Sequence, residues 1–252
     1  MRDYLIPKSF NPDGYRNLLH SFVDLGYKVK NFTGDSGQVA QLDKPHLILR
    51  HDIDMSLDAA LNIAKVEAGI GFNATYFVLL RSEMYNIFSK SSEYSLKKIM
   101  EMGHKIGLHF DASQYKDNIS FLDSAAQQEC NILEDWLKSS VEIISFHRPA
   151  QKILGLSERL AGRMHTYQPH FFKHMGYCSD SRGAWHHGDP LGHVVVRNRH
   201  ALQLLTHPIW WQEYNDNTVQ ESLDRFSRKH TNIFRNDLGN NCQVYDSSKP
   251  LV

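Results

Sequence analysis

Acidic and imidazole side chains recur in this sequence directly after short apolar segments. Asp52 and Asp54 come after HLILR, His109 after KIGL, His147 after EIISF, and His207 after LQLLT. Carboxylates and imidazoles are the side chains that bind first-row divalent cations and transfer protons near neutral pH. If the apolar segments are parallel strands, their carboxyl ends meet on one rim, where barrel folds place their active sites. The pattern therefore predicts one catalytic site.

The spacing of Asp52 and Asp54 places both carboxylates on one side of an extended chain, because residues i and i+2 of a strand face the same way. Two like charges that close require a cation between them or a shared proton. The alternative is that one of the two caps the helix expected from Leu57. Ser56 can supply that cap alone, so we interpret the pair as part of the site.

His109 and His147 are interpreted as metal ligands beside this carboxylate pair. A carboxylate with imidazoles suits Zn²⁺ or a similar first-row ion, and a catalytic site keeps one position open for water. For His109 the alternative is a buried histidine bonded to the backbone. For His147 the alternative is that its ring does not bind the ion and instead makes a hydrogen bond to one of the residues that do. His104 precedes the strand that His109 follows, so we expect it at the opposite end and outside the site.

His207 lies where Pro208 ends an apolar segment, and we interpret it as the proton donor of the site. An ordinary imidazole pKa of about 6.5 suits proton donation at neutral pH; the alternative is a strand-end histidine bonded to the backbone. Asp180 is expected to orient this ring through a hydrogen bond. Arg182 is expected to bind a substrate anion or a carboxylate, and Trp185 to stack on a sugar ring. Surface ion pairs are the alternative for Asp180 and Arg182, and simple burial is the alternative for the tryptophan.

Apolar and amphipathic segments alternate along most of the chain. The segments that read as buried strands are 46–49, 74–80, 105–108, 142–146, 175–178 and 202–206. Helical spacing is found at 15–25, 57–68, 95–102, 121–138 and 218–229. Strands that alternate with helices form crossover units and a mostly parallel sheet covered on both faces. About six or seven such units favour an α/β barrel, complete or partly open, over an open sheet.

Length and composition fit one globular domain. The 252 residues suit a single α/β barrel, so we treat 1–252 as one domain, with a helical and strand-forming extension at 1–44 and a polar surface tail at 230–252. The formal net charge is zero and no basic cluster occurs, which argues against a nucleic-acid partner. No segment of 18 apolar residues occurs, so no membrane span is expected. Three cysteines without a CxxC pair and an N-terminus without an apolar leader lead us to expect a cytoplasmic protein.

The motifs together resemble those of the polysaccharide deacetylase family, also called carbohydrate esterase family 4. HDID, which contains Asp52 and Asp54, resembles the first motif, an acidic pair after a strand. GHKIGLH, ending at His109, resembles the second motif. FHRPA at 146–150 resembles the Arg-x-Pro segment, and LTH at 205–207 matches the final Leu-x-His motif. The motifs occur in the family's order and span most of the chain.

The resemblance implies a distorted, partly open (β/α) barrel with about seven mostly parallel strands. It also implies a role for each matched residue. Asp52 would be the general base, Asp54 and His109 would bind the metal, and His207 would be the general acid.

The same motifs carry further assignments and one departure. The backbone N–H near Ala150 would form the oxyanion hole, and we assign Arg148 of the same segment with it to substrate and oxyanion binding. In the family a second His follows the His of the second motif four positions on, where this chain has Ser113. We therefore assign the third ligand position to His147, which stands where the family has its Arg; a water is the alternative.

These residues predict a metal-dependent hydrolase of linear amide C–N bonds. The expected substrate is an N-acetylated or N-formylated amino sugar, or its nucleotide- or lipid-linked form, used in surface polysaccharide biosynthesis. The expected cofactor is a divalent metal, with zinc first. One alternative is an amidohydrolase that acts on a small non-sugar amide. The other is a non-catalytic carbohydrate-binding protein with a degenerate site, which the missing His of the second motif would explain.

Overall fold

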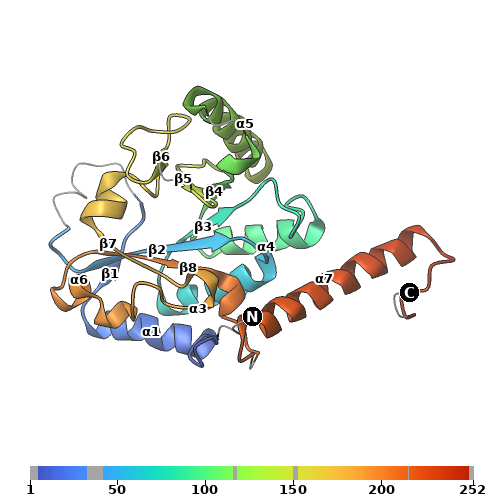
Figure 1. The fold of residues 1–252 in the computed structure, drawn as a ribbon, viewed down its shortest axis with the longest axis horizontal. Coiled ribbons are helices and arrows are strands. Elements are labelled where there is room, and N and C mark those ends of the chain that lie inside the picture. The colour runs from blue at the N-terminus through green and yellow to red at the C-terminus, as the bar shows by residue number, and fades with distance from the viewer. Residues whose placement is uncertain (1–4, 33–41, 116–117, 150–152, 215, 250–252) are drawn as a thin grey trace.

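In the structure, a computed structural model that describes residues 5–32, 42–115, 118–149, 153–214 and 216–249, the apolar segments form one sheet of parallel strands (Figure 1). Among these residues the strands are β1 (Lys28–Val29), β2 (His46–Ile53), β3 (Thr75–Val78), β4 (Lys105–Phe110), β5 (Ile143–Phe146), β6 (Met164–His165), β7 (Gly176–Ser179) and β8 (Leu202–Thr206). Their order is β6-β5-β4-β3-β2-β8-β7, and β1 pairs with the first residues of β2. No pairing of described residues joins β6 to β7, so the sheet is a curled half-barrel, which confirms the predicted partly open (β/α) barrel.

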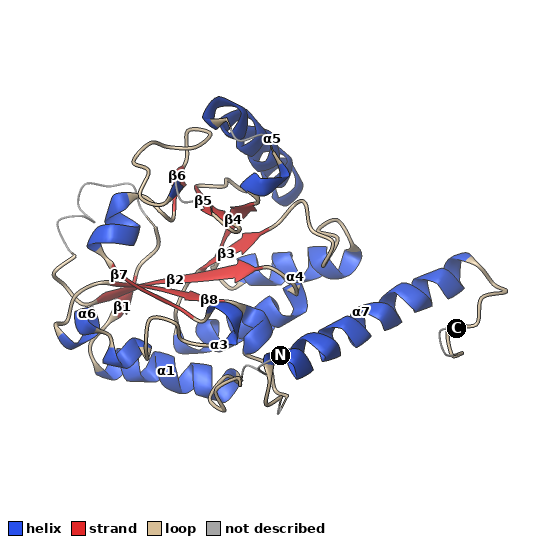
Figure 2. Cartoon of the chain, in the orientation of Figure 1, coloured by secondary structure: helices blue, strands red, loops and turns tan. Residues whose placement is uncertain are grey.

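Helices surround the sheet (Figure 2). They are α1 (Pro12–Asp24), α3 (Leu57–Ile70), α4 (Lys90–Glu101), α5 (Ile119–Leu137), α6 (Val194–Arg197) and α7 (Val219–Asn241). The five longer helices begin at a residue whose side-chain oxygen accepts a hydrogen bond from the backbone N–H groups of the first turn, and these residues are Asn11, Ser56, Ser89, Asn118 and Thr218. Because Ser56 caps α3, the carboxylates of Asp52 and Asp54 remain for other partners.

The side chains at the odd-numbered positions of β2 pack against the helices. Leu47, Leu49 and Ile53 belong to the larger hydrophobic cluster, which includes the buried faces of α1 and α3. His51 points the same way, and its Nε2 lies 2.7 Å from Oε1 of Glu67 on α3, with both side chains fully buried. Alternation of side chains along a strand explains why these positions share one face.

The even-numbered positions of β2 face the inside of the half-barrel. Ile48 belongs to a smaller hydrophobic cluster there, together with Phe77. The guanidinium of Arg50 lies 5.6 Å from the centroid of the Phe77 ring. Asp52 follows on the same face, and Asp54 continues the alternation just after the strand ends. The strand therefore carries both carboxylates toward one mouth of the half-barrel.

Several element boundaries differ from the prediction. Helix α4 begins at Lys90, because Ser89 caps it, although the apolar spacing begins only at Ser95. Helix α7 was predicted to end at Lys229 and continues to Asn241, since a polar composition without proline does not end a helix. Figure 1 shows α7 projecting away from the sheet. The strands β1 and β6 have two residues each, too few to produce a periodic pattern.

The cysteines are free thiols, with Cys130 and Cys178 buried and Cys242 exposed. The two buried thiols sit in the hydrophobic core, where the cysteine side chain behaves as a small apolar group. In the described parts of the chain, we find no helix with the length and apolar character needed to span a bilayer.

Candidate active site

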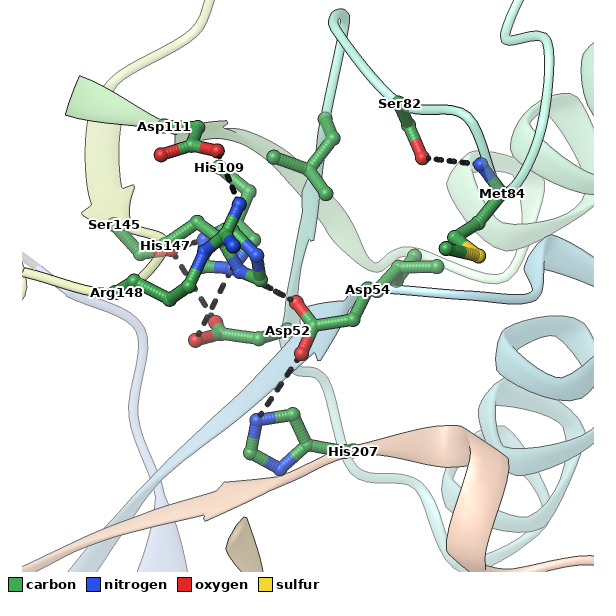
Figure 3. A network of polar contacts seen from close by, with 12 residues as sticks. Asp52, Asp54, Ser82, Met84, His109, Asp111, Ser145, His147, Arg148 and His207 are labelled. Atoms are coloured by element: carbon green, nitrogen blue, oxygen red, sulfur yellow. Dashed lines mark hydrogen bonds and ion pairs between the residues drawn. The ribbon is translucent and has the colours of Figure 1, made fainter. Parts of the chain in front are cut away.

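The polar side chains that follow the strands gather at one mouth of the half-barrel (Figure 3). They line a cavity of about 310 Å³. Asp52 and Asp54 come from the end of β2, His109 from β4, His147 from the residue after β5, and His207 from the residue after β8. These are the residues that the sequence pattern placed on one rim. The parallel sheet brings them together because its carboxyl ends share an edge.

Asp54, His109 and His147 present three ligand atoms to a common point. Asp54 Oδ1 lies 3.1 Å from His109 Nε2 and 3.1 Å from His147 Nδ1, and the two ring nitrogens are 3.2 Å apart. In a tetrahedral zinc site the ligand atoms lie about 2.0–2.1 Å from the ion and therefore about 3.3–3.4 Å from one another. This arrangement, called the ligand triangle below, fits a first-row divalent cation with a fourth position open.

The charge state of Asp54 suits a metal ligand. Its side chain is 23% exposed, and burial alone would raise its pKa. Hydrogen bonds from His109 and His147, together with the nearby imidazole charges, instead hold the pKa of Asp54 well below its ordinary value. An ionised carboxylate is the form that binds a cation.

A chain of hydrogen bonds fixes which nitrogen of His109 belongs to the ligand triangle. His109 Nδ1 lies 2.5 Å from Ser145 Oγ, and Ser145 Oγ donates to Asp52 Oδ1 at 3.3 Å. Because the serine gives its only proton to the carboxylate, it must accept a hydrogen bond from Nδ1–H. Nε2, which donates to Asp54 in the metal-free site, is then the nitrogen that would lose its proton and offer a lone pair to a bound metal. The sequence reasoning missed Ser145, because its position opposite His109 follows only from the register of the two neighbouring strands.

Arg50 was also missed, and it binds both oxygens of Asp52. Arg50 Nε donates to Oδ1 at 2.9 Å and Nη2 donates to Oδ2 at 2.7 Å, between side chains that are 0% and 4% exposed. Burial would raise the pKa of Asp52, but the guanidinium and the nearby imidazoles lower it. Asp52 is therefore ionised at neutral pH. The signal was a charged residue inside an apolar strand, two positions before Asp52 and so on the same face.

Asp180 holds His207 by its backbone and by its ring. Asp180 Oδ1 accepts a hydrogen bond from the backbone N–H of His207 at 3.0 Å and lies 2.6 Å from the ring Nδ1. Trp211 Nε1 donates to Asp180 Oδ2 at 2.6 Å. Burial would lower the pKa of His207, but the charge and hydrogen bond of Asp180, with smaller effects of Asp54 and Asp52, raise it to about 9. With Nδ1 bound to Asp180, Nε2 faces the site, 3.9 Å from Asp54 Oδ2.

Ser113, which stands where the family has a ligand His, serves Asp111. Its backbone N–H and hydroxyl donate to Asp111 Oδ1 at 3.1 and 2.6 Å. Arg148 Nη2 donates to Asp111 Oδ2 at 2.7 Å, while 66% of the arginine side chain remains exposed. The third corner of the ligand triangle comes from His147 instead.

The remaining predicted residues are placed as follows. Arg182 lines the cavity and is exposed. His104 lies at the start of β4, where its ring bonds to the backbone of Ala64 and Ala74, away from the cavity. Ala150 lies outside the described residues.

Trp185 does not line the cavity. Its ring makes an edge contact with Phe10, with the centroids 5.3 Å apart, and a tilted contact with Trp211 at 5.8 Å. It therefore packs against the hydrophobic core while its side chain stays partly exposed, and a role in stacking on a sugar stays a prediction.

No protein-family model matches the chain, and no curated protein matches its sequence. Several solved structures that match it belong to the family that the motifs resemble. A family 4 carbohydrate esterase from Streptococcus mutans is 16% identical, with a TM-score of 0.48 over 80% of this chain and 89% of that one. One from Bacillus anthracis is 16% identical, with a TM-score of 0.44 over 86% of each chain. A family 4 pseudoenzyme from Bacillus anthracis is 13% identical, with a TM-score of 0.42 over 75% of this chain and 61% of that one. At these identities and TM-scores, the function of the site rests on its own geometry.

Proposed function

We propose that this chain is a metal-dependent hydrolase that removes an N-linked acetyl or formyl group from an amino sugar or from its nucleotide- or lipid-linked form. The observation that carries the proposal is the ligand triangle, with sides of 3.1 to 3.2 Å. Zinc is the ion that a carboxylate with two imidazoles suits best. When bound there, the cation supplies a Lewis acid that polarises the acyl carbonyl and makes a nearby water more acidic.

Asp52 and His207 supply the proton transfers. Asp52 Oδ2 lies 3.8 Å from His109 Nε2, and His207 Nε2 lies 3.9 Å from Asp54 Oδ2, so both groups border the ligand triangle. The lowered pKa of Asp52 keeps it ready to accept the proton of the attacking water, although its pairing with an arginine weakens its affinity for that proton. The raised pKa of His207 keeps it ready to protonate the leaving amine. Two titratable groups whose pKa values are pushed apart are the usual mark of a base and an acid.

The feature that favoured a non-catalytic protein is Ser113 in place of a ligand histidine. His147 weakens this argument for a non-catalytic protein, because its Nδ1 lies 3.1 Å from the Asp54 carboxylate and supplies the third candidate metal ligand. Asp52 and His207 are also both present at the cavity. A binding protein would need neither group.

Metal content tests the ligand triangle. After reconstitution with zinc and removal of free metal, elemental analysis should find about one ion per chain in the wild type and in Asp52→Asn. Asp54→Ala and His109→Ala should lose most of it, because each removes one of three donors. His186→Ala, an exposed histidine that does not line the cavity, is the matched control and should keep it. A wild type that retains no ion would overturn the metal site.

Turnover tests the chemistry. Release of acetate or formate is measured with N-acetyl and N-formyl amino sugars, with a nucleotide-linked N-acetyl sugar, and with small ureide-type amides. Asp52→Asn should keep its metal and lose about two orders of magnitude or more in kcat, the usual scale for a general base. Normal turnover by Asp52→Asn would show that another group takes the proton. Hydrolysis of the small amides alone would replace the sugar substrate with the non-sugar class.

A further inference from the structure

Charges at the cavity are paired, with one exception. Three of the charged side chains that line it have partners of opposite charge, namely Asp52 with Arg50, Arg148 with Asp111, and His207 with Asp180, and Asp54 is the carboxylate of the ligand triangle, where a cation would balance it. Arg182 is exposed at the same cavity and has no acidic partner anywhere in the described ranges. A cation bound at the ligand triangle would add further positive charge. With that cation bound, the cavity would have an excess of positive charge beside the reacting centre.

The backbone at Arg182 is held in an unusual conformation. Its φ of 59° and ψ of 29° are left-handed, a conformation that costs a non-glycine residue about 1–2 kcal/mol. The turn is fixed on both sides, because Asp180 is fully buried and bonded to His207, and Gly183 (φ 76°) packs against the side chains of Val219 and Trp210. Backbone strain of this kind is concentrated at functional sites.

A second arginine with a left-handed backbone conformation lies on the other side of the site. Arg148 has a φ of 49° and directly follows the ligand His147 at the end of β5. In the strand order, β5 lies on one side of β2 and β7, which precedes Arg182, lies on the other. The two guanidinium groups thus approach the cavity from opposite flanks of the strand that carries the carboxylates. Arg148 keeps 66% of its side chain exposed while it bonds to Asp111.

We propose that the substrate carries an anionic oxygen group, a phosphate or a carboxylate, on the same unit as the acylated amine, and that Arg182 binds it with Arg148 as a second contact. A guanidinium presents donors in a planar fork that matches both anions bidentately. The cavity, at about 310 Å³, is at the small end of small-molecule sites. An anion bound at its rim must therefore lie close to the acyl group. This inference rests on the proposed deacylation and names its substrate class.

The test compares substrates that differ only in charge. Zinc-loaded protein is assayed with N-acetylglucosamine, N-acetylglucosamine 1-phosphate and an N-acetylated amino uronic acid. The wild type should prefer at least one of the charged sugars in kcat/KM, and the preferred one identifies phosphate or carboxylate as the group recognised. Arg182→Gln should reduce that preference about ten- to hundredfold, mainly through KM, because a hydrogen-bonded charge pair contributes on that scale. The preference of Arg182→Lys for the charged sugar should lie between those of the wild type and Arg182→Gln, since lysine keeps the positive charge but lacks the planar fork of donors.

Binding supplies a readout that does not depend on turnover. Isothermal titration of the zinc-loaded Asp52→Asn variant with the preferred charged sugar should show the same ten- to hundredfold loss when Arg182→Gln is added. Arg197→Gln makes the same substitution at an exposed residue of α6 that does not line the cavity, and should change neither affinity nor preference. Thermal melts of the variants confirm that the fold is kept.

The possible failures are distinguishable. If the wild type hydrolyses neutral and charged sugars equally well and Arg182→Gln leaves both rates unchanged, the anion site is refuted and the deacylase stands. If the wild type binds no metal and cleaves no amide, but binds the charged sugar through Arg182, the deacylase is refuted and the anion site stands as a binding site. Equal binding of the charged sugar by Arg182→Gln and its parent refutes the anion site in either case.

Discussion

The buried pair of Arg50 and Asp52 allows a quantitative test of how the site is built. In Arg50→Met the carboxylate loses both of its charged hydrogen bonds, at 2.9 and 2.7 Å, inside a region where its side chain is 4% exposed. Breaking a buried pair by removing one partner typically costs about 3–5 kcal/mol. In a chain of this size a loss of 1 kcal/mol lowers the melting temperature by about 2–4 °C. We therefore expect Arg50→Met to melt about 6–20 °C below the wild type.

The assay is urea unfolding at pH 7 and pH 4, with thermal melts alongside. Because the pKa of Asp52 is lowered in the folded wild type, the pair stabilises the fold above the unfolded pKa of about 4 and is lost as the pH falls through the lower folded value. In Arg50→Met the carboxyl can hold a proton, so the difference between the two proteins should shrink from pH 7 to pH 4. The double variant Arg50→Met, Asp52→Leu should recover most of the loss, since an apolar pair can replace a buried ion pair.

A matched control limits what a positive result can mean. Arg16→Met removes an ion pair with Asp13 at the surface, where the two side chains are 44% and 83% exposed, and should cost less than about 1 kcal/mol. If Arg50→Met costs no more than this control, Asp52 is not held by a buried guanidinium, and the reasoning that keeps it ionised would fail.

Three further changes have defined outcomes. Ser145→Ala removes the acceptor that fixes the imidazole tautomer and should weaken zinc binding about 10- to 100-fold in a chelator competition; unchanged affinity would contradict the tautomer assignment. In the metal-free protein, NMR titration should find His207 with a pKa of about 9, and Asp180→Asn should return it toward about 6.5. This raised pKa stabilises the fold fully below about pH 6.5, and the stabilisation is lost as the pH rises through about 9; a variant with the same titration curve as the wild type would exclude Asp180 as the cause. Gly107→Ala places a Cβ 2.5 Å from a ring atom of Phe77 and should cost about 1–3 kcal/mol in urea unfolding; a stable variant would mean that the ring can move aside.

The sequence predicted the site better than it predicted the partners that support it. Asp54, His109 and His147 follow apolar strands, and a parallel sheet makes strand ends converge whatever the loops between them do. Arg50 and Ser145 lie inside strands instead, where a polar residue is read as an interruption of the apolar pattern. The partner of Arg50 is Asp52, two positions later on the same face of β2, whereas the contact of Ser145 with His109 becomes visible only when the register of β4 and β5 is known.

Other features depended on tertiary packing, which a single sequence does not display. Trp185 is of a residue type that can stack on sugars, but its ring also makes an edge contact with Phe10, which lies far from it in the sequence. Helix α7 has the composition of a tail, but its polar residues continue the helix to Asn241. In both cases residue type was a weak guide, because contacts with distant segments or the absence of a helix-breaking residue decided the structure.

Both faces of β2 carry buried polar contacts, and this restricts which sequence changes the protein can accept. Arg50 and Asp52 face inward, while His51 faces outward to Glu67. An insertion or deletion of one residue within the strand would turn every later side chain to the opposite face. The carboxylates would then meet the apolar surfaces of the helices, and an imidazole would take their place inside. Length variation among variants of this protein should therefore be confined to the connecting loops, while β2 changes only by replacement.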